Sequence, residues 1–444
     1  MKRFVRSLIT PERLRVLGLP VPWIAFAVVQ LFVLWEGWVL PNQPMGDVYN
    51  VYGPWSSEAL QGRVVGVTEP WVYPPVALVP MLLPRLLVLI TDYTMAWAVM
   101  VVILNAIGFG MLLGRGTSRA RVLAASFWVL FALALGPIGL YRIDAVTVPL
   151  AVIAVLILAR HPRIAGVLFA IGAWIKIWPG AMLVAAVVAL RSRWRVLVPA
   201  IVFSCAVMLI VVLGGGAGHL FGFLTTQSDR GLQVEAPVST PYAWAAMLRL
   251  PGAAVVYNQD IVTFQVTGAG ADVVSALTTP LLVLVAAAIA IIGAVKARAG
   301  VSQRRLLPPL ALALVLAFIV CNKVGSPQFQ IWLIAPVVLW ILWDRRDVLP
   351  YALLAIAAAL LTQFIYPIMY DRVLTAHFSA VLLLTARNAI LVGMLVALIV
   401  RLVRLPVVRP MVQAGTTVPA AGTDEPTFAA GAGAFAAGEE ERQP

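Results

Sequence analysis

Residues 21–55 read VPWIAFAVVQLFVLWEGWVL-PNQPMGDVYNVYGPW, a long apolar run followed by a polar and aromatic segment. About 20 mainly apolar residues are the length that crosses the hydrocarbon core of a bilayer as a helix. The segment that follows, residues 41–55, places a carboxylate, Asp47, just beyond the end of that helix. Because acidic residues are scarce in this chain, we interpret Asp47 as a catalytic base on which the other polar loops converge.

The composition defines the class of protein. The 444 residues are 62% hydrophobic and 11% charged, with a mean hydropathy of +0.96, which excludes a soluble globular protein. Apolar runs of about 20 residues recur without the alternation of barrel strands, so the sequence predicts an all-α polytopic membrane protein. Two cysteines, Cys205 and Cys321, provide neither a disulfide framework nor a metal site. We expect no cofactor and no nucleic-acid partner.

Apolar runs predict about twelve transmembrane helices, and a thirteenth run, residues 75–90, is ambiguous. It contains Pro80, Pro84 and Arg85, which disfavour a spanning helix, so we expect an external or re-entrant helix there. The predicted domains are a basic cytoplasmic N-terminus (1–20), a transmembrane domain (21–405) with external loops 41–92 and 215–271, and a disordered cytoplasmic tail (406–444). The predicted spans are 21–40, 93–113, 121–136, 144–160, 163–176, 179–190, 196–214, 272–295, 306–322, 328–343, 349–368 and 379–403.

The distribution of charge predicts the orientation. With these spans, 22 of the 32 lysines and arginines fall in the termini and short loops on one side. By the positive-inside rule that side is cytoplasmic, and both termini lie there. The loops on the other side carry most of the acids and amides, so we expect the functional site at the extracytoplasmic face of the plasma membrane.

Polar side chains at the outer ends of the spans form the candidate site. Charges near a membrane interior are costly and usually mark a function, and cations at an outer face suit a lipid-linked phosphate. Each also has a simpler explanation: Asp47 as a helix cap, Arg142 and Asp144 as a mutual ion pair, Lys176 reaching the headgroups. We predict Asp47 as the catalytic residue, Arg142, Lys176, Arg230 and Lys323 as phosphate-binding residues, and Tyr49, Tyr73, Asp144, Gln233, Glu235 and Gln328 as sugar- or acceptor-binding residues.

Four short motifs, taken in their order along the chain, resemble those of a known protein family. After the basic N-terminus and first span come GDVYNVY (46–52), WVYPP (71–75), WIKIWP (174–179) and SPQFQIWL (326–333). Over roughly residues 1–405 the chain resembles the polyprenyl-phosphate-sugar-dependent glycosyltransferases of the GT-C class, and among them glycosyltransferase family 87, the alpha-mannosyltransferases of the actinobacterial envelope.

The resemblance implies a sugar donor on a polyprenyl monophosphate, a glycolipid or lipoglycan acceptor, and Asp47 as the general base of an inverting transfer. It also implies that membrane lipids surround the enzyme. The family has histidines near the start of the helix that begins here at Gln328, whereas this chain has Gln328 and Phe329. The resemblance favours mannose as the sugar, whereas this departure counts against mannose and leaves a pentose open. The alternatives are a lipid-linked sugar flippase and an oligosaccharide ligase that uses a diphosphate-linked donor.

Overall fold

The computed structural model describes residues 16–224, 230–259 and 263–406. These residues belong to one compact unit, Met1–Val408. The predicted basic N-terminus up to residue 15 and the predicted tail, except Pro406, lie outside the described residues.

Eight helices of the described part are long and apolar enough to cross a membrane. They differ in burial: α15 is the most enclosed, whereas α11 and α14 expose most of their apolar surface. In a chain of this composition such exposed apolar faces are suited to lipid, and enclosed helices form the core. The eight are α3 (Pro20–Val39), α6 (Tyr93–Leu113), α7 (Arg119–Leu135), α11 (Arg193–Leu213), α14 (Ala271–Arg298), α15 (Gln303–Val320), α17 (Val348–Gln363) and α19 (Phe378–Arg404).

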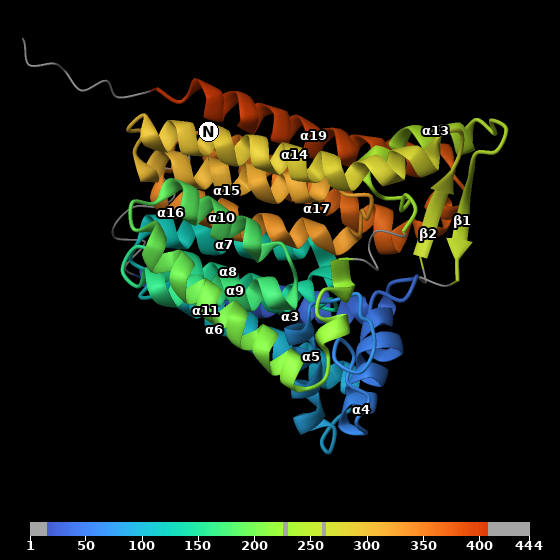
Figure 1. The fold of residues 1–444 in the computed structure, drawn as a ribbon, viewed down its shortest axis with the longest axis horizontal. Helices are drawn as coiled ribbons and strands as arrows, with labels where there is room; N and C mark the ends of the chain where they lie inside the picture. Colours follow the sequence, from blue (N-terminus) through green and yellow to red (C-terminus); the bar gives the residue numbers. More distant parts are fainter. Residues whose placement is uncertain (1–15, 225–229, 260–262, 407–444) are drawn as a thin grey trace, which may run out of the picture. The chain divides into compact units, whose positions relative to one another are not determined.

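Shorter apolar helices pack among the long ones (Figure 1). Each of the twelve predicted spans coincides with a helix, and the prediction of an all-α polytopic membrane protein is confirmed. Residues 75–87 form only short helical turns, as their prolines suggest. The short helices are α8 (Asp144–Ile157), α9 (Pro162–Ile175), α10 (Pro179–Ala189), α16 (Ile334–Trp343) with the preceding turn η7 (Pro327–Leu333), and α5 (Leu78–Leu82) between η2 (Pro75–Ala77) and η3 (Leu83–Leu87).

Two inserted segments, 41–92 and 215–271, lie at the same end of the helices (Figure 1). The first contains a π-helical turn, η1 (Val48–Tyr52), and α4 (Gly53–Leu60). Arg85 fastens the later turns of this segment to α4, because its Nε donates to Ser56 Oγ at 2.8 Å. The second contains η5 (Ala217–His219), η6 (Pro237–Ser239), α13 (Thr240–Met247) and the strands β1 (Ala254–Asn258) and β2 (Thr263–Thr267).

The β1–β2 pair is antiparallel and was not predicted. Its Val, Tyr, Phe and Thr residues favour strands, but the segment is too short to compete with the apolar helical pattern that dominates the sequence. Three further short elements complete the described chain: η4 (Gly136–Gly139), η8 (Phe364–Ile368) and α18 (Tyr370–Leu374).

Candidate active site

Asp47 lies against Arg142, a residue remote in the sequence. The Asp47 Oδ2 atom is 3.2 Å from Arg142 Nε, and the two side chains are 36% and 7% exposed. Asp47 directly precedes η1, yet its side chain makes no capping hydrogen bond there. The carboxylate is therefore held by a buried cation while remaining open to a small reactant.

Arg142 connects three parts of the chain. Its Nη1 donates to the carbonyl oxygens of Pro44 at 2.7 Å and Tyr141 at 3.1 Å, and its Nη2 donates to the Tyr366 hydroxyl at 3.4 Å. The Tyr366 hydroxyl in turn donates to the carbonyl of Asn42 at 2.9 Å. Protein acceptors thus engage the guanidinium on several sides, and Arg142 holds the segment before Asp47 in place.

Two tyrosines extend the site from Asp47 toward Lys176. The Tyr52 hydroxyl accepts a hydrogen bond from the Ile143 amide at 3.1 Å. Burial raises the pKa of Tyr73; the nearby Lys176 opposes the rise, and Asp47 and Asp144 add to it. Tyr73 therefore stays a neutral phenol, able to donate a hydrogen bond, between the two charged clusters.

Lys176 and Asp144 form the second charged cluster. Lys176 Nζ lies 3.9 Å from Asp144 Oδ2, whereas Trp332 Nε1 donates to the other oxygen, Oδ1, at 2.6 Å. The ammonium also lies over the rings of Tyr73, at 4.6 Å, and Phe329, at 5.6 Å. The suggested ion pair between Arg142 and Asp144 is thus replaced by two other pairs, Arg142 with Asp47 and Lys176 with Asp144.

Stacked aromatic rings bring two of the sequence motifs together. Trp178 stacks on Trp332 with ring centroids 6.0 Å apart, and Phe329 stacks on Trp332 at 4.1 Å. Trp178 Nε1 donates to Thr147 Oγ1 at 2.9 Å, one turn along α8 from Asp144. The motifs at 174–179 and 326–333 therefore form a single wall beside Lys176.

Arg230 lies in the second inserted segment, and Lys323 lies in the loop between α15 and η7. Arg230 is half-buried, and its Nε atom is buried without a hydrogen-bond partner among the described residues. Burial lowers the pKa of Arg230, and the electrostatic effect of Tyr73 opposes this. Lys323 is buried, and its carbonyl accepts a hydrogen bond from the Gln233 amide at 3.0 Å.

Gln233 and Glu235 fix the second inserted segment against the loop before η7. The Gln233 Oε1 atom accepts from the Gly325 amide at 3.2 Å. Gly325 has no room for a side chain, because its Cβ would meet the backbone of Ala236. Glu235 is 1% exposed, and burial raises its pKa. Gln233 therefore helps to hold the loop in place, and the assignment of Gln233 and Glu235 to sugar or acceptor binding stays a prediction.

Tyr49 and Gln328 stand apart from these contacts. Tyr49 lies on η1 with 40% of its surface exposed, and Gln328 is buried in η7. Neither is among the residues that the interactions above bring together, so their assignment to sugar or acceptor binding stays a prediction.

Sequence reasoning missed several residues around the site. Arg387 of α19 is 2% exposed, and its Nη2 donates to the Glu235 carbonyl at 2.6 Å. Tyr366 and Tyr370, whose rings meet edge to face at 4.8 Å, lie between Arg142 and Glu235. A cation inside a predicted span was the available signal for Arg387, because such a charge is costly unless it is used.

Within residues 16–224, 230–259 and 263–406, no three His, Cys, Asp or Glu side chains gather in a way that could hold a metal ion. The candidate site is thus an arrangement of two carboxylates, cations and phenols. Such a set can accept a proton at one end and bind an anion at the other.

Comparison with known families agrees with this chemistry. Residues 71–266 match the family model described as glycosyltransferase family 87. No curated protein matches the chain. The matched region contains Tyr73, Arg142, Asp144, Lys176, Arg230, Gln233 and Glu235. The resemblance of this multi-pass membrane protein to glycosyltransferase family 87 is therefore confirmed over residues 71–266.

Proposed function

We propose that this membrane glycosyltransferase moves a sugar from a polyprenyl monophosphate to a glycolipid or lipoglycan at the extracytoplasmic face, with inversion at the anomeric carbon. Mannose is the favoured sugar and a pentose is the second candidate. The observation that carries the proposal is the half-open carboxylate of Asp47, held at 3.2 Å by buried Arg142. The match of residues 71–266 to the glycosyltransferase family supports it.

In the proposed reaction Asp47 acts as general base. Its carboxylate takes the proton of the acceptor hydroxyl while the hydroxyl oxygen attacks the anomeric carbon. The bond between that carbon and the phosphate oxygen breaks, and the polyprenyl phosphate leaves with the electron pair. A base positioned in this way contributes about 10²–10⁴-fold in rate.

The leaving phosphate needs positive charge and hydrogen-bond donors. Lys176 is the best placed cation, because it lies 4.6 Å from the ring centroid of Tyr73, whose neutral hydroxyl could donate to a phosphate oxygen. Arg230 interacts electrostatically with Tyr73, and its buried Nε is unpartnered among the described residues. We therefore assign phosphate binding to Lys176 and Arg230, with Lys323 as a further candidate. Preorganised charge of this kind is often the largest single contribution to catalysis.

Arg142 takes a different role in this proposal from the one its sequence position suggested. Its guanidinium already contacts Asp47, two carbonyls and Tyr366. We assign it to positioning Asp47 rather than to binding phosphate. Asp144, in turn, positions Lys176 from the wall that also contains Trp332.

The two rival functions make different demands on the chain. A flippase requires a polar path along the length of the helices, whereas the charged pairs described here gather where the inserted segments meet the helices. A ligase requires a diphosphate-linked donor, with more anionic charge to bind. The present arrangement favours a monophosphate donor.

The deciding experiment is transfer in proteoliposomes. The purified protein receives radiolabelled sugars on polyprenyl monophosphate or diphosphate, together with a glycolipid extract as acceptor, and products are separated by mass. The proposal expects labelled glycolipid from a monophosphate donor, none from the diphosphate, and transfer by Asp47→Asn that is about 10²–10⁴-fold slower. Movement of the donor across the bilayer without transfer, or transfer from the diphosphate alone, would establish a rival function.

A further inference from the structure

A cavity lies at the far end of the helices from the candidate site. It has a volume of about 960 Å³, and its walls come from the first halves of α7 and α17 and the end of α16. The α7 helix begins at this cavity with Arg119 and ends at Leu135, a few residues before Arg142. At 1.5 Å per residue, its 17 residues separate the two places by roughly 25 Å.

The rim of this cavity is strongly basic. Four arginines line it: Arg119, Arg304, Arg345 and Arg346. The single acid among its lining residues is Asp344, and its Oδ1 already accepts a hydrogen bond from the Arg346 amide at 3.3 Å. Four guanidinium forks beside a single acid suit a phosphate-sized anion, because each fork can bind two oxygens.

The body of the cavity is apolar. Its walls include Leu123, Phe127, Leu130, Leu353 and Ile356, carried by two membrane-spanning helices. Leu130 is 52% and Leu353 48% exposed, so these walls face outward from the helix core. A basic rim above an apolar groove between spanning helices matches an amphiphile with an anionic head.

We infer that this cavity binds an anionic phospholipid, with its phosphate against the arginines at the rim and an acyl chain along the groove between α7 and α17. This occupant fits both halves of the cavity. Free phosphate leaves the groove unfilled, and a zwitterionic lipid lacks the net charge that the rim complements. The inference is independent of the proposed transfer reaction, since it concerns neither the donor nor Asp47.

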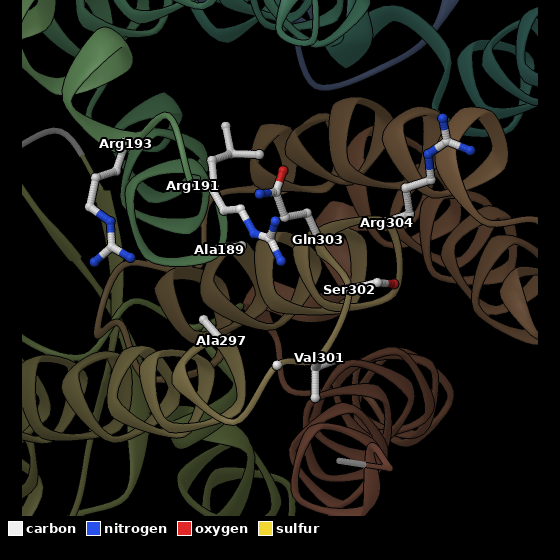
Figure 2. Close-up of a pocket in the computed structure, with 10 residues that line it drawn as sticks. Ala189, Arg191, Arg193, Ala297, Val301, Ser302, Gln303 and Arg304 are labelled. Atoms are coloured by element: carbon white, nitrogen blue, oxygen red, sulfur yellow. The ribbon is translucent and has the colours of Figure 1, made fainter. Parts of the chain in front are cut away.

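A neighbouring pocket provides a matched control. It has a volume of about 350 Å³, shares Arg304 with the first cavity, and is also lined by Arg191 and Arg193 (Figure 2). It lacks the long apolar groove of its neighbour. Removing two arginines there changes the charge of the protein by the same amount without touching the proposed lipid site.

The test is lipid binding by native mass spectrometry of the full chain in detergent, with phosphatidylglycerol, phosphatidylcholine and inorganic phosphate as probes. We expect phosphatidylglycerol to bind more tightly than phosphatidylcholine, and the Arg345→Gln/Arg346→Gln pair to weaken it about tenfold or more. Arg191→Gln/Arg193→Gln should leave its affinity unchanged.

If the Arg345→Gln/Arg346→Gln variant does not fold, a variant that fills the apolar groove provides a second test. Leu353→Trp retains every charge and should weaken phosphatidylglycerol, but not inorganic phosphate. If both double-arginine variants lost the same affinity for phosphatidylglycerol, the effect would come from overall charge, and the proposed site would be wrong. Equal affinity for the two lipids, or a Leu353→Trp protein that binds phosphatidylglycerol as the wild type does, would overturn it too.

Discussion

The carboxylate of Asp47 and the guanidinium of Arg142 meet at 3.2 Å, although one precedes η1 and the other lies in the turn between α7 and α8. The pair is asymmetric in exposure, at 36% against 7%. A buried arginine that holds a half-open carboxylate fixes the direction of the carboxylate and leaves one side for a substrate. The first two predictions follow from this pair.

Asp47→Asn should lower the rate of sugar transfer by about 10²–10⁴-fold, since the amide keeps the shape of the side chain but cannot accept the acceptor proton. The measurement is transfer by purified protein, with thermal unfolding in detergent to show that the variant is folded. Asp371→Asn, an exposed acid in α18, is the control and should retain activity. A folded Asp47→Asn enzyme with wild-type turnover would exclude Asp47 as the base.

Arg142→Lys should also lose most activity, because an ammonium cannot reach Asp47, Pro44 and Tyr366 together. If Arg142 acts through Asp47, the Asp47→Asn/Arg142→Lys double variant should be no slower than Asp47→Asn alone. The readout is kcat together with KM for the donor. Losses that multiply in the double variant would instead assign Arg142 a separate contact with the donor.

Lys176→Met should weaken binding of the polyprenyl phosphate by about tenfold or more, the equivalent of roughly 1.4 kcal/mol or more. Lys176→Arg should restore part of the affinity, since it returns the charge. Competition of polyprenyl phosphate with the labelled donor measures the effect. Arg63→Met is the control, because Arg63 is a cation of the first inserted segment whose side chain is 65% exposed. Equal affinities in Lys176→Met and wild type would remove Lys176 from phosphate binding.

Glu235 predicts a dependence of stability on pH. Burial raises its pKa above the ordinary value of 4.5, so the folded state holds the proton more tightly than the unfolded state. Its contribution to stability is complete below the ordinary value and is lost as the pH rises through the raised pKa. Glu235→Gln mimics the protonated form and should escape this loss.

The measurement is the Tm of Glu235→Gln and wild type in detergent between pH 4 and pH 8. The difference in Tm should grow in favour of the variant as the pH rises. Asp371→Asn should follow the wild type throughout. A difference in Tm that is constant over this range would contradict the assignment to Glu235.

The helices were predictable, whereas the contacts between distant residues were not. Each span follows from a local run of apolar residues, and α6 therefore coincides with the predicted span 93–113. Differences are confined to the ends of helices, as at Pro327, where a tight turn precedes α16. That Asp144 would contact Lys176 and Trp332 rather than Arg142 depends on how α8, α9 and η7 pack. The spacing of residues in the sequence does not predict that packing. The energetic cost of burying a charge did, however, identify Asp144 and Lys176 as candidate site residues.

The short helices around Asp144 have a consequence for bilayer depth. A helix of 14 residues, the length of both α8 and α9, covers about 21 Å, less than the roughly 30 Å of a hydrocarbon core. Arg160 in the turn between them and Arg163 at the start of α9 suit one headgroup layer. We therefore expect the opposite ends, with Asp144 and Lys176, to lie in a recess below the other bilayer surface. Hydrophobic mismatch at this point would thin the surrounding leaflet and shorten the path by which a membrane-embedded phosphate reaches Lys176.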